Sequence, residues 1–457
     1  MSDFDLVIRA DRVLIDGRWK KAAVGVNGGI ITRIGPRHAE WSAREIVSVP
    51  SDEVLIPGVI DTHVHVNEPG RTEWEGFATA TRAAAAGGVT TIIDMPLNSI
   101  PPTTTVEALE LKREAAEREA HVDIGFWGGA IPSSVGALRP LHEAGVFGFK
   151  AFLSPSGVDE FPHLSAAQLR EALAETAAFG GRVIIHAEDP ERLEPYSGSR
   201  YYDDFVASRP DASETSAIAT IISAVRATGG RAHILHLSSA KALNQIRGAK
   251  AEGLDITVET CPHYLVFEAD EIADGQTQYK CCPPVRDRAN REALWEALED
   301  GTIDFIASDH SPATEELKVG ADGDFGRAWG GISGLQVMLS AVLGGARDRG
   351  IKLEDALAWL TTEPAAFAGF EDKGAIREGF RADLVSFAPD RSWSVRAQAL
   401  EHRNPVSAFE GHTLVGVATR TWVGGAQAHP HVDEEPPAGR LLMRPGAMME
   451  TAGAAAR

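Results

Sequence analysis

Residues 58–70 read GVIDTHVHVNEPG, and they place His63 and His65 on either side of one valine, directly after an apolar run. Side chains alternate between the two faces of an extended strand, so residues two positions apart point the same way. Both imidazoles would then converge on one point, as the ligands of a metal ion do. The alternative is a pair of histidines at a polar strand end, and this stretch alone leaves both interpretations open.

Short apolar segments recur along the chain after this one, and each is followed by enough residues for a helix. One helix is expected over LSAAQLREALAETAAFGG, where Ser165 is a suitable N-terminal cap and Gly180–Gly181 a stop. Alternating strands and helices predict a parallel sheet, and eight strands over about 250–300 residues predict a (β/α)₈ TIM barrel. We expect this barrel to span residues 54–370. The eight predicted strands are PGVIDTHVH, GVTTIIDMP, VDIGFWGGA, GVFGFKAF, GRVIIHAED, AHILHLSSA, LDITVETCPHY and TIDFIASDH.

The two ends of the chain have a different pattern. Residues 1–53 alternate apolar and polar positions between the turn signals DGRW and NGG, which is typical of a β-meander. Residues 371–426 contain similar short segments, such as ADLVSFAP and VGVATRTWVGG. We expect both ends to form one small β-sandwich domain. Residues 427–457, rich in Ala, Gly and Pro, are expected to be a tail that is flexible or packs on a neighbouring subunit.

The composition restricts the classes of partner. Lys and Arg number 44 and Asp and Glu 65, which gives a formal net charge of −21. Nucleic acids and anionic membranes attract basic surfaces, so this balance argues against both. Three cysteines do not suggest a disulfide framework, and the N-terminus lacks the pattern of a signal peptide. No apolar run is long enough to span a membrane, so we expect a cytoplasmic protein.

Polar side chains gather at the ends of the predicted strands, where barrel enzymes place their active sites. One histidine at a strand end is usually a hydrogen-bonded structural residue. Six polar groups at the same end of a barrel would each need a partner near the core. The sequence therefore predicts a metal site at this end. The six candidates, from five strands, are His63, His65, Lys150, His186, His236 and Asp309.

The residue types indicate which metals would bind. Imidazole and carboxylate ligands suit zinc, and also iron, cobalt or manganese. The set exceeds the needs of one four-coordinate ion and suits two divalent ions about 3.5–4 Å apart. Lys150 is the exception, because an ammonium group would repel both ions. Either burial keeps it neutral, or CO₂ has converted it into a carbamate that bridges the ions.

Six motifs, in this order, resemble those of the cyclic amidohydrolases, the group that contains dihydroorotases, hydantoinases or dihydropyrimidinases, and allantoinases. The resemblance implies that the two histidines of the first strand hold one ion and that His186 and His236 hold the other. It also implies that a carboxylated Lys150 bridges the ions and that Asp309 is a catalytic metal ligand that moves the proton. The motifs are GVIDTHVH, GFKAF, IIHAE, HILHLSSA, ETCPHYL and SDHSP.

Segments outside the metal site are most similar to allantoinases, among them DMPLNSIPPTTT, FVASRPDASETSAI and AWGGISGLQ. This resemblance implies an enzyme, homotetrameric or dimeric, that hydrolyses the cyclic ureide allantoin to allantoate. It also implies that the substrate ring is contacted by the backbone of Cys282, where a serine is common in the family, and by that of Gly331.

Two alternatives remain open. Hydantoinases and dihydropyrimidinases place a tyrosine five residues after the bridging lysine, and this chain has Pro155 there. Dihydroorotases are expected to offer an arginine close to the first strand, where this chain has Asn67 and Glu68, with Arg71 further on. The rival enzyme is therefore a hydantoinase or dihydropyrimidinase. The rival of another class is a non-catalytic scaffold, which would be expected to have lost some of the six candidate ligands.

Overall fold

Two parallel sheets form the body of the molecule in the computed structural model, which describes residues 3–320, 322–431 and 439–447. The first has the order β6-β7-β8 and the second the order β9-β10-β11-β12-β13-β14. Only Trp127 separates β8 from β9, so the two are successive parts of one extended segment. The strands are β6 (Val59–Val64), β7 (Val89–Asp94), β8 (Asp123–Phe126), β9 (Gly128–Gly129), β10 (Phe149–Phe152), β11 (Arg182–His186), β12 (Arg231–Ile234), β13 (Ile256–Thr260) and β14 (Phe305–Ile306).

The parallel pairings continue from one strand to the next and return to the first. Each strand from β6 to β8 and from β9 to β14 pairs in parallel with its neighbour. A parallel bridge between Val64 and His310 joins β6 to the segment that follows β14. Every residue of β6, β7, β8, β10 and β11 is buried. Burial on both faces explains why these strands do not alternate between apolar and polar positions.

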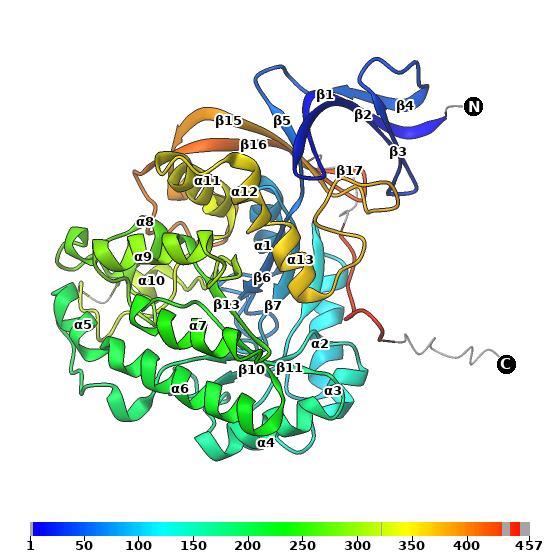
Figure 1. The fold of residues 1–457 in the computed structure, drawn as a ribbon. Coiled ribbons are helices and arrows are strands. Elements are labelled where there is room, and N and C mark those ends of the chain that lie inside the picture. Colours follow the sequence, from blue (N-terminus) through cyan, green and yellow to red (C-terminus); the bar gives the residue numbers. More distant parts are fainter. Residues whose placement is uncertain (1–2, 321, 432–438, 448–457) are drawn as a thin grey trace.

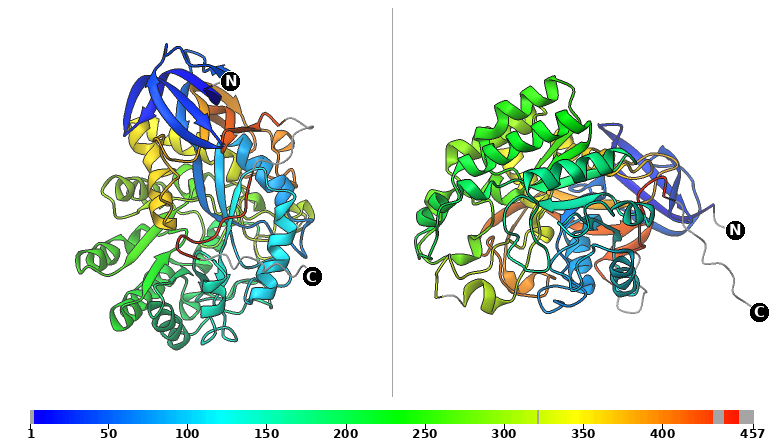
Figure 2. Two further views of the ribbon diagram at one scale, coloured as in Figure 1. Left: turned by 90° about the vertical axis from the view of Figure 1, so that its right-hand side faces the viewer. Right: turned by 90° about the horizontal axis from the view of Figure 1, so that it is seen from below.

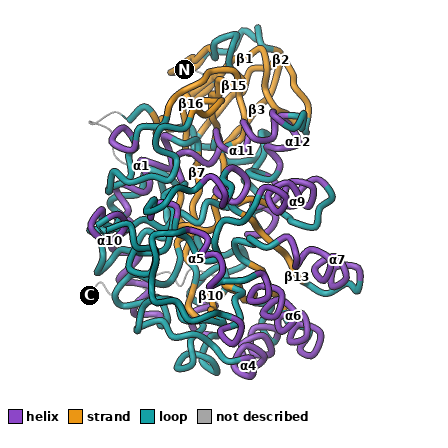
Figure 3. Tube along the Cα trace, turned by 90° about the vertical axis from the view of Figure 1, so that its left-hand side faces the viewer, coloured by secondary structure: helices purple, strands orange, loops and turns teal. Residues whose placement is uncertain are grey.

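Helices lie on the outer side of these strands, as Figure 3 shows for α4, α6, α7 and α9. Ser165 caps α4 as predicted, because its side chain accepts from Gln168 N and the Gln168 side chain accepts from Ser165 N. The helices are α1 (Phe77–Ala86), α2 (Val106–Glu117), α3 (Arg139–Glu143), α4 (Ala166–Ala177), α5 (Tyr202–Ser208), α6 (Asp211–Thr228), α7 (Leu243–Ala251), α8 (Pro262–Val266), α9 (Arg288–Glu299), α10 (Glu315–Val319), α11 (Met338–Asp348), α12 (Leu353–Ala358) and α13 (Thr362–Ala368). None of the helices in the described ranges has the length and apolar character needed to cross a bilayer.

Strands from both ends of the chain join in one eight-stranded sheet, seen at the top of Figure 1. Its order is β17-β16-β15-β5-β1-β2-β3, and β4 pairs with β1. The antiparallel pair β5–β15 connects the N-terminal strands to the C-terminal ones. Buried Ile8, Val24, Leu55, Leu384 and Trp422 form part of one apolar cluster there. The strands are β1 (Phe4–Ile15), β2 (Arg18–Asn27), β3 (Ile30–Pro36), β4 (Ala43–Ser48), β5 (Val54–Pro57), β15 (Leu384–Ser394), β16 (Thr413–Val423) and β17 (Ala426–His429).

The predicted C-terminal tail differs from expectation where the structure describes it. β17 extends into its first residues, and residues 439–447 lie against β8 of the same chain (Figure 2). Ile124 N donates to Arg440 O at 2.9 Å, and Leu442 N donates to Ile124 O at 2.7 Å. These backbone bonds, together with the burial of Leu442, explain why this part packs on its own chain. The other residues of the predicted tail lie outside the described ranges.

A buried group of charges connects β8 to the segment that leads into β15. Lys373 Nζ lies 2.8 Å from Asp123 Oδ2 and 2.5 Å from Asp383 Oδ2, and it donates to Thr91 Oγ1 at 3.1 Å. Arg440 of the C-terminal segment contacts the same Asp123 oxygen at 3.2 Å. One lysine therefore holds together strands from three separate parts of the sequence.

We predict that Lys373→Met destabilises the protein, because it leaves two buried carboxylates without their ammonium partner. Removing one partner of a buried pair costs up to about 3–5 kcal/mol. Arg381 and Arg440, which also contact Asp123, should reduce this cost, so the midpoint of urea unfolding should fall by less than the full amount. Lys20→Met, which removes an exposed pair with Asp16 at 3.8 Å, is the control and should leave the midpoint unchanged. Equal midpoints for the two variants would contradict the role given to Lys373.

Candidate metal centre and active site

One cavity of about 340 Å³ opens at the carboxyl ends of the parallel strands. All of the residues that the sequence predicts for the site line this cavity. They are the six candidate ligands His63, His65, Lys150, His186, His236 and Asp309, and the two candidate substrate contacts Cys282 and Gly331.

The strand ends explain how residues so far apart in sequence come together. β6 carries His63 and is followed directly by His65, and Lys150 lies on β10. His186 is the last residue of β11, and His236 and Asp309 follow β12 and β14 within a few residues. Because neighbouring parallel strands end at the same edge, their terminal side chains share one space.

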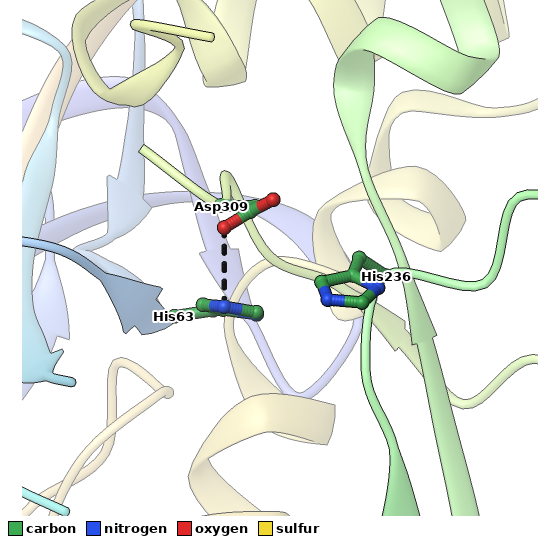
Figure 4. A group of neighbouring side chains, drawn as sticks. All are labelled: His63, His236 and Asp309. Carbon is green, nitrogen blue, oxygen red and sulfur yellow. Dashed lines mark ion pairs between the residues drawn. The ribbon is translucent and has the colours of Figure 1, made fainter. Parts of the chain in front are cut away.

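The side chains of His63, His236 and Asp309 form the centre of the cluster (Figure 4). One ligand atom from each lies within 4.8 Å of the others, and all three residues are buried. Asp309 Oδ1 lies 3.1 Å from His63 Nε2 and 3.5 Å from His65 Nε2. These distances and the burial meet the requirements for a shared cation.

Unsatisfied nitrogens provide a test of whether a metal fits. His63 Nε2, His65 Nδ1 and His236 Nδ1 are buried and have no hydrogen-bond partner among the described residues. A buried polar atom without a partner is costly and uncommon in folded proteins. A coordinated cation would satisfy His63 Nε2, which faces Asp309, so this pair of residues fits a metal centre.

The backbone at two of the candidate ligands is also unusual. His236 has φ +37° and Asp309 has φ +45°, both in the left-handed region that few residues other than glycine adopt. Such strain persists where the surrounding structure holds it in place, and it clusters at functional sites. Both residues line the cavity, and Figure 4 shows their side chains on the same side as His63.

Glu259, on β13, contacts His63 and the backbone of His236 with its carboxylate oxygens. Its Oε1 lies 2.5 Å from His63 Nδ1 and accepts from His236 N at 3.3 Å, while its Oε2 lies 3.1 Å from His233 Nε2. If His63 donates through Nδ1, the lone pair of its Nε2 faces Asp309. The carboxylate thus selects the tautomer of His63 that can bind a metal, as acidic partners of metal-binding histidines do.

Glu188 fixes the orientation and the tautomer of His186 in a similar way. His186 Nε2 lies 2.6 Å from Glu188 Oε2, which leaves Nδ1 facing His236 Nε2 at 3.0 Å. Arg209 donates to both oxygens of Glu188, from Nε at 2.9 Å and from Nη2 at 2.6 Å. Although burial acts to raise the pKa of Glu188, Arg209 and His186 together lower it, so the carboxylate stays ionised.

Burial sets the protonation states within the cluster. It lowers the pKa of His63 to about 3 and that of His65 to about 4, so both imidazoles are neutral near pH 7. Burial also acts to raise the pKa of Asp309, but the neighbouring His63, His65 and His236 outweigh it and hold the pKa well below its usual range. The site therefore offers neutral imidazoles and one carboxylate, which are the forms that bind metals.

Lys150 is buried in the cavity wall, and its Nζ lies 4.5 Å from the centre of the Phe152 ring. Within the described residues this Nζ makes neither an ion pair nor a hydrogen bond. Burial lowers the pKa of Lys150 to about 8, although Asp309 and Glu259 oppose that shift. A fraction of the side chain is therefore an unprotonated amine near neutral pH, the form that reacts with CO₂.

The two candidate substrate contacts, Cys282 and Gly331, line the same cavity as the cluster. Cys282 is partly buried, and no hydrogen bond within the described residues uses its N–H or C=O. Gly331 has φ +131°, and a Cβ there would lie 2.3 Å from Ser311 O, so only glycine fits. Gly331 N already donates to Lys280 O at 2.9 Å.

Comparison with known proteins identifies the family. The Amidohydrolase family matches residues 54–427. The chain belongs to the amidohydrolase family. An allantoinase from Streptomyces avermitilis is 53% identical over 446 residues, which covers 97% of this chain and 100% of that protein. An allantoinase from Arabidopsis thaliana is 43% identical over 92% of this chain and 87% of that one.

Solved structures agree with this family assignment. The L-hydantoinase (dihydropyrimidinase) from Arthrobacter aurescens superposes with a TM-score of 0.91 and is 29% identical, covering 96% of this chain and 100% of that chain. The dihydropyrimidinase from Brevibacillus agri superposes with a TM-score of 0.85 at 25% identity. The chain therefore shares its fold with these hydantoinases.

Sequence reasoning missed the acidic residues that bond to the candidate ligands of this amidohydrolase. Glu188 stands two positions after His186 in the motif IIHAE, and Glu259 opens the motif ETCPHYL. An acidic residue at the end of a predicted parallel strand was the available signal for both. Arg209 gave no such signal, because it lies on the loop after α5 and reaches the site only through the tertiary fold.

We predict that Glu259→Gln weakens metal binding by about 10–100-fold, which is the usual effect of losing a carboxylate partner of a metal-binding histidine. The neutral amide no longer enforces the tautomer of His63 that offers Nε2. Competition with a chelator measures the affinity directly. Glu292→Gln, which alters a partly exposed pair with Arg349, is the matched control and should leave it unchanged. Equal metal affinities for both variants would contradict this role.

Proposed function

We propose that this chain is an allantoinase, which hydrolyses the ring amide of allantoin to give allantoate. The observation that carries the proposal is its 40–53% identity to several allantoinases over more than nine-tenths of the chain. The eight predicted site residues lining one cavity support the same function. We further propose a cytoplasmic enzyme that assembles as a homotetramer, as the family resemblance implies.

We propose that the parallel strands and their helices form a (β/α)₈ barrel over residues 54–370. The proposal is supported by the return of the strand pairing from β14 to β6 and by the likeness to L-hydantoinase. Residues 1–53 and 371–426 would form a separate β-sandwich domain, whose sheet also includes β5 (Val54–Pro57) and β17 (Ala426–His429). Its contribution is support, because none of the residues that line the cavity belongs to it.

The metal centre would hold two divalent cations, most simply zinc, with iron, cobalt or manganese as alternatives. His63 and His65 would bind one ion and His186 and His236 the other, with Lys150 carboxylated by CO₂ as the bridge. When bound, such cations polarise the amide carbonyl and make water acidic near neutral pH. The unsatisfied ring nitrogens of the cluster support this assignment.

Asp309 would move the proton. As the oxygen of water bonds to the ring carbonyl carbon, the Asp309 carboxylate accepts the proton that the water loses. Asp309 then donates it to the ring nitrogen as the carbon–nitrogen bond breaks and the ring opens. Its low pKa and its position beside His63 and His65 support a carboxylate that is ionised before the reaction begins.

A hydantoinase or dihydropyrimidinase is the second candidate, because the solved structures that superpose well carry those names. Pro155 lines the cavity at the position where those enzymes are expected to have a tyrosine, which favours allantoin. A non-catalytic scaffold is disfavoured because all six candidate ligands are present.

We predict that the purified protein, loaded with zinc in the presence of bicarbonate, hydrolyses allantoin in preference to the other cyclic amides. The panel comprises racemic allantoin, a 5-substituted hydantoin, dihydrouracil and dihydroorotate, with kcat/KM measured for each. Removing the metal with a chelator should abolish turnover, and adding zinc should restore it. A higher kcat/KM for hydantoin or dihydrouracil would favour the second candidate.

We predict that Lys150→Ala lowers kcat by about 10²–10³-fold or more, because the cations lose the group that bridges them. The bound metal should fall with it, as measured by elemental analysis. Lys241→Ala, at a lysine outside the cavity lining, is the control and should retain both properties. Full activity in Lys150→Ala would rule out a bridging role for this lysine.

A further inference from the structure

Lys318, on α10, is a buried lysine outside the metal cluster. Its ammonium group donates hydrogen bonds to backbone carbonyls. Its Nζ donates to Lys280 O at 2.7 Å, to Trp329 O at 3.0 Å and to Gly331 O at 2.5 Å. An ammonium group has three donors, so these three acceptors use all of them. The side chain is 4% exposed.

This pattern differs from that of two other buried lysines outside the cavity, Lys373 and Lys112. Lys373 pairs with carboxylates, and Lys112 pairs with Asp94 Oδ2 at 2.6 Å. Lys318 forms no ion pair within the described residues. Burial therefore lowers the pKa of Lys318 to about 7, which reflects the cost of withdrawing its charge from water without a carboxylate partner.

The three carbonyls belong to two stretches of chain that form one side of the cavity, residues 280–282 and 329–331, here named the pocket wall. Lys280, Cys282, Trp329, Gly330 and Gly331 all line the cavity. The two stretches are joined directly by the bond from Gly331 N to Lys280 O. Lys318 thus lies behind the pocket wall and bonds to both of its halves.

We propose that Lys318 is a positioning residue for substrate, which holds the two halves of the pocket wall together so that their backbone groups meet the ring of the bound cyclic amide. The proposal rests on the proposed function only in assuming that a cyclic amide occupies this cavity. Lys318 touches neither the candidate ligands nor the reacting atoms, so its action is through the wall.

Electrostatics explains why a cation is needed at this position. Three carbonyl oxygens converge on one point, and their partial negative charges repel each other when no donor lies between them. Charge-assisted hydrogen bonds are stronger than neutral ones, so Lys318 in its protonated form satisfies and fixes all three groups, whereas a neutral amine could donate to only two. An apolar side chain of similar length would fill the space and leave the carbonyls unpaired, which separates the halves of the wall.

The backbone of α10 adds a second connection. Trp329 N donates to Leu317 O at 2.9 Å, one residue before Lys318. In addition, Lys280 Nζ donates to Ala328 O at 2.6 Å. These two bonds remain when Lys318 is substituted. A variant is therefore expected to fold, with a pocket wall that is held less rigidly.

The role predicts a particular kinetic effect. Backbone contacts to the ring are made before and during the reaction, so loosening them removes binding that ground state and transition state share. Such a loss raises KM and leaves kcat nearly unchanged. Loss of metal would instead lower kcat, as would misplacement of Asp309.

The first experiment compares Lys318→Met, Lys318→Arg and the control Lys250→Met on allantoin, with metal content and melting temperature measured alongside. Lys250 is a partly buried lysine on α7 that bonds Asp304 and Gly301 away from the cavity. Lys318→Met should raise KM by about tenfold or more with kcat within about threefold. Lys318→Arg, which keeps the donors, should recover part of the loss, and Lys250→Met should match the unsubstituted enzyme. An unchanged KM in Lys318→Met, or a fall in kcat alone, would overturn the proposal.

A binding measurement separates this proposal from the chemistry. In the Asp309→Asn background, which should bind without turnover, calorimetry with allantoin should show weaker binding when Lys318→Met is added. Equal affinities would overturn the positioning role. If the unsubstituted enzyme hydrolyses a different cyclic amide, the proposed function fails, and the same pair of variants is compared on that substrate. If Lys318→Met does not fold, Lys318→Gln, which is shorter and uncharged but keeps two donors, is expected to raise KM by a smaller amount, and an unchanged KM would overturn the proposal.

Discussion

The desolvation of imidazoles and a carboxylate at the ends of parallel strands is the constraint on which the rest of the structure depends. Burial makes the histidines neutral and leaves nitrogens of His63, His65 and His236 without partners. Such atoms are tolerated where a cation satisfies them. The backbone is strained at the same site. His236 and Asp309 both have positive φ angles, and the surrounding structure holds them in these conformations.

Three levels of the structure maintain that arrangement. The parallel strands bring the ligands to one edge, and the buried carboxylates of Glu259 and Glu188 then orient the imidazoles. The pocket wall, whose two halves Lys318 bonds, lines the same cavity as the cluster. The fold is shared with hydantoinases, so the choice between cyclic amides depends on the groups that line the cavity outside the cluster. Pro155 and Trp329 are among them.

Much of the site follows from the sequence, because its regularities are local. The two-residue period of a strand places His63 and His65 on one face, and the rule that parallel strands end together collects the other candidates. Glu259 was less accessible, because its role depends on which histidine lies beside it after folding. Lys318 gave no signal, since bonds to backbone carbonyls involve no second distinctive side chain. The packing of residues 439–447 on β8 was missed for the same reason.

Anomalous diffraction from a crystal of the zinc-loaded protein, recorded at the zinc absorption edge, tests the central claim most directly. The account predicts two peaks between His63, His65, Lys150, His186, His236 and Asp309, with density continuing from Lys150 Nζ to both. A single peak beside Cys261 and His263, the other buried group near Asp309 able to hold a metal among the described residues, would contradict it. So would two peaks with an unmodified Lys150 turned away from them.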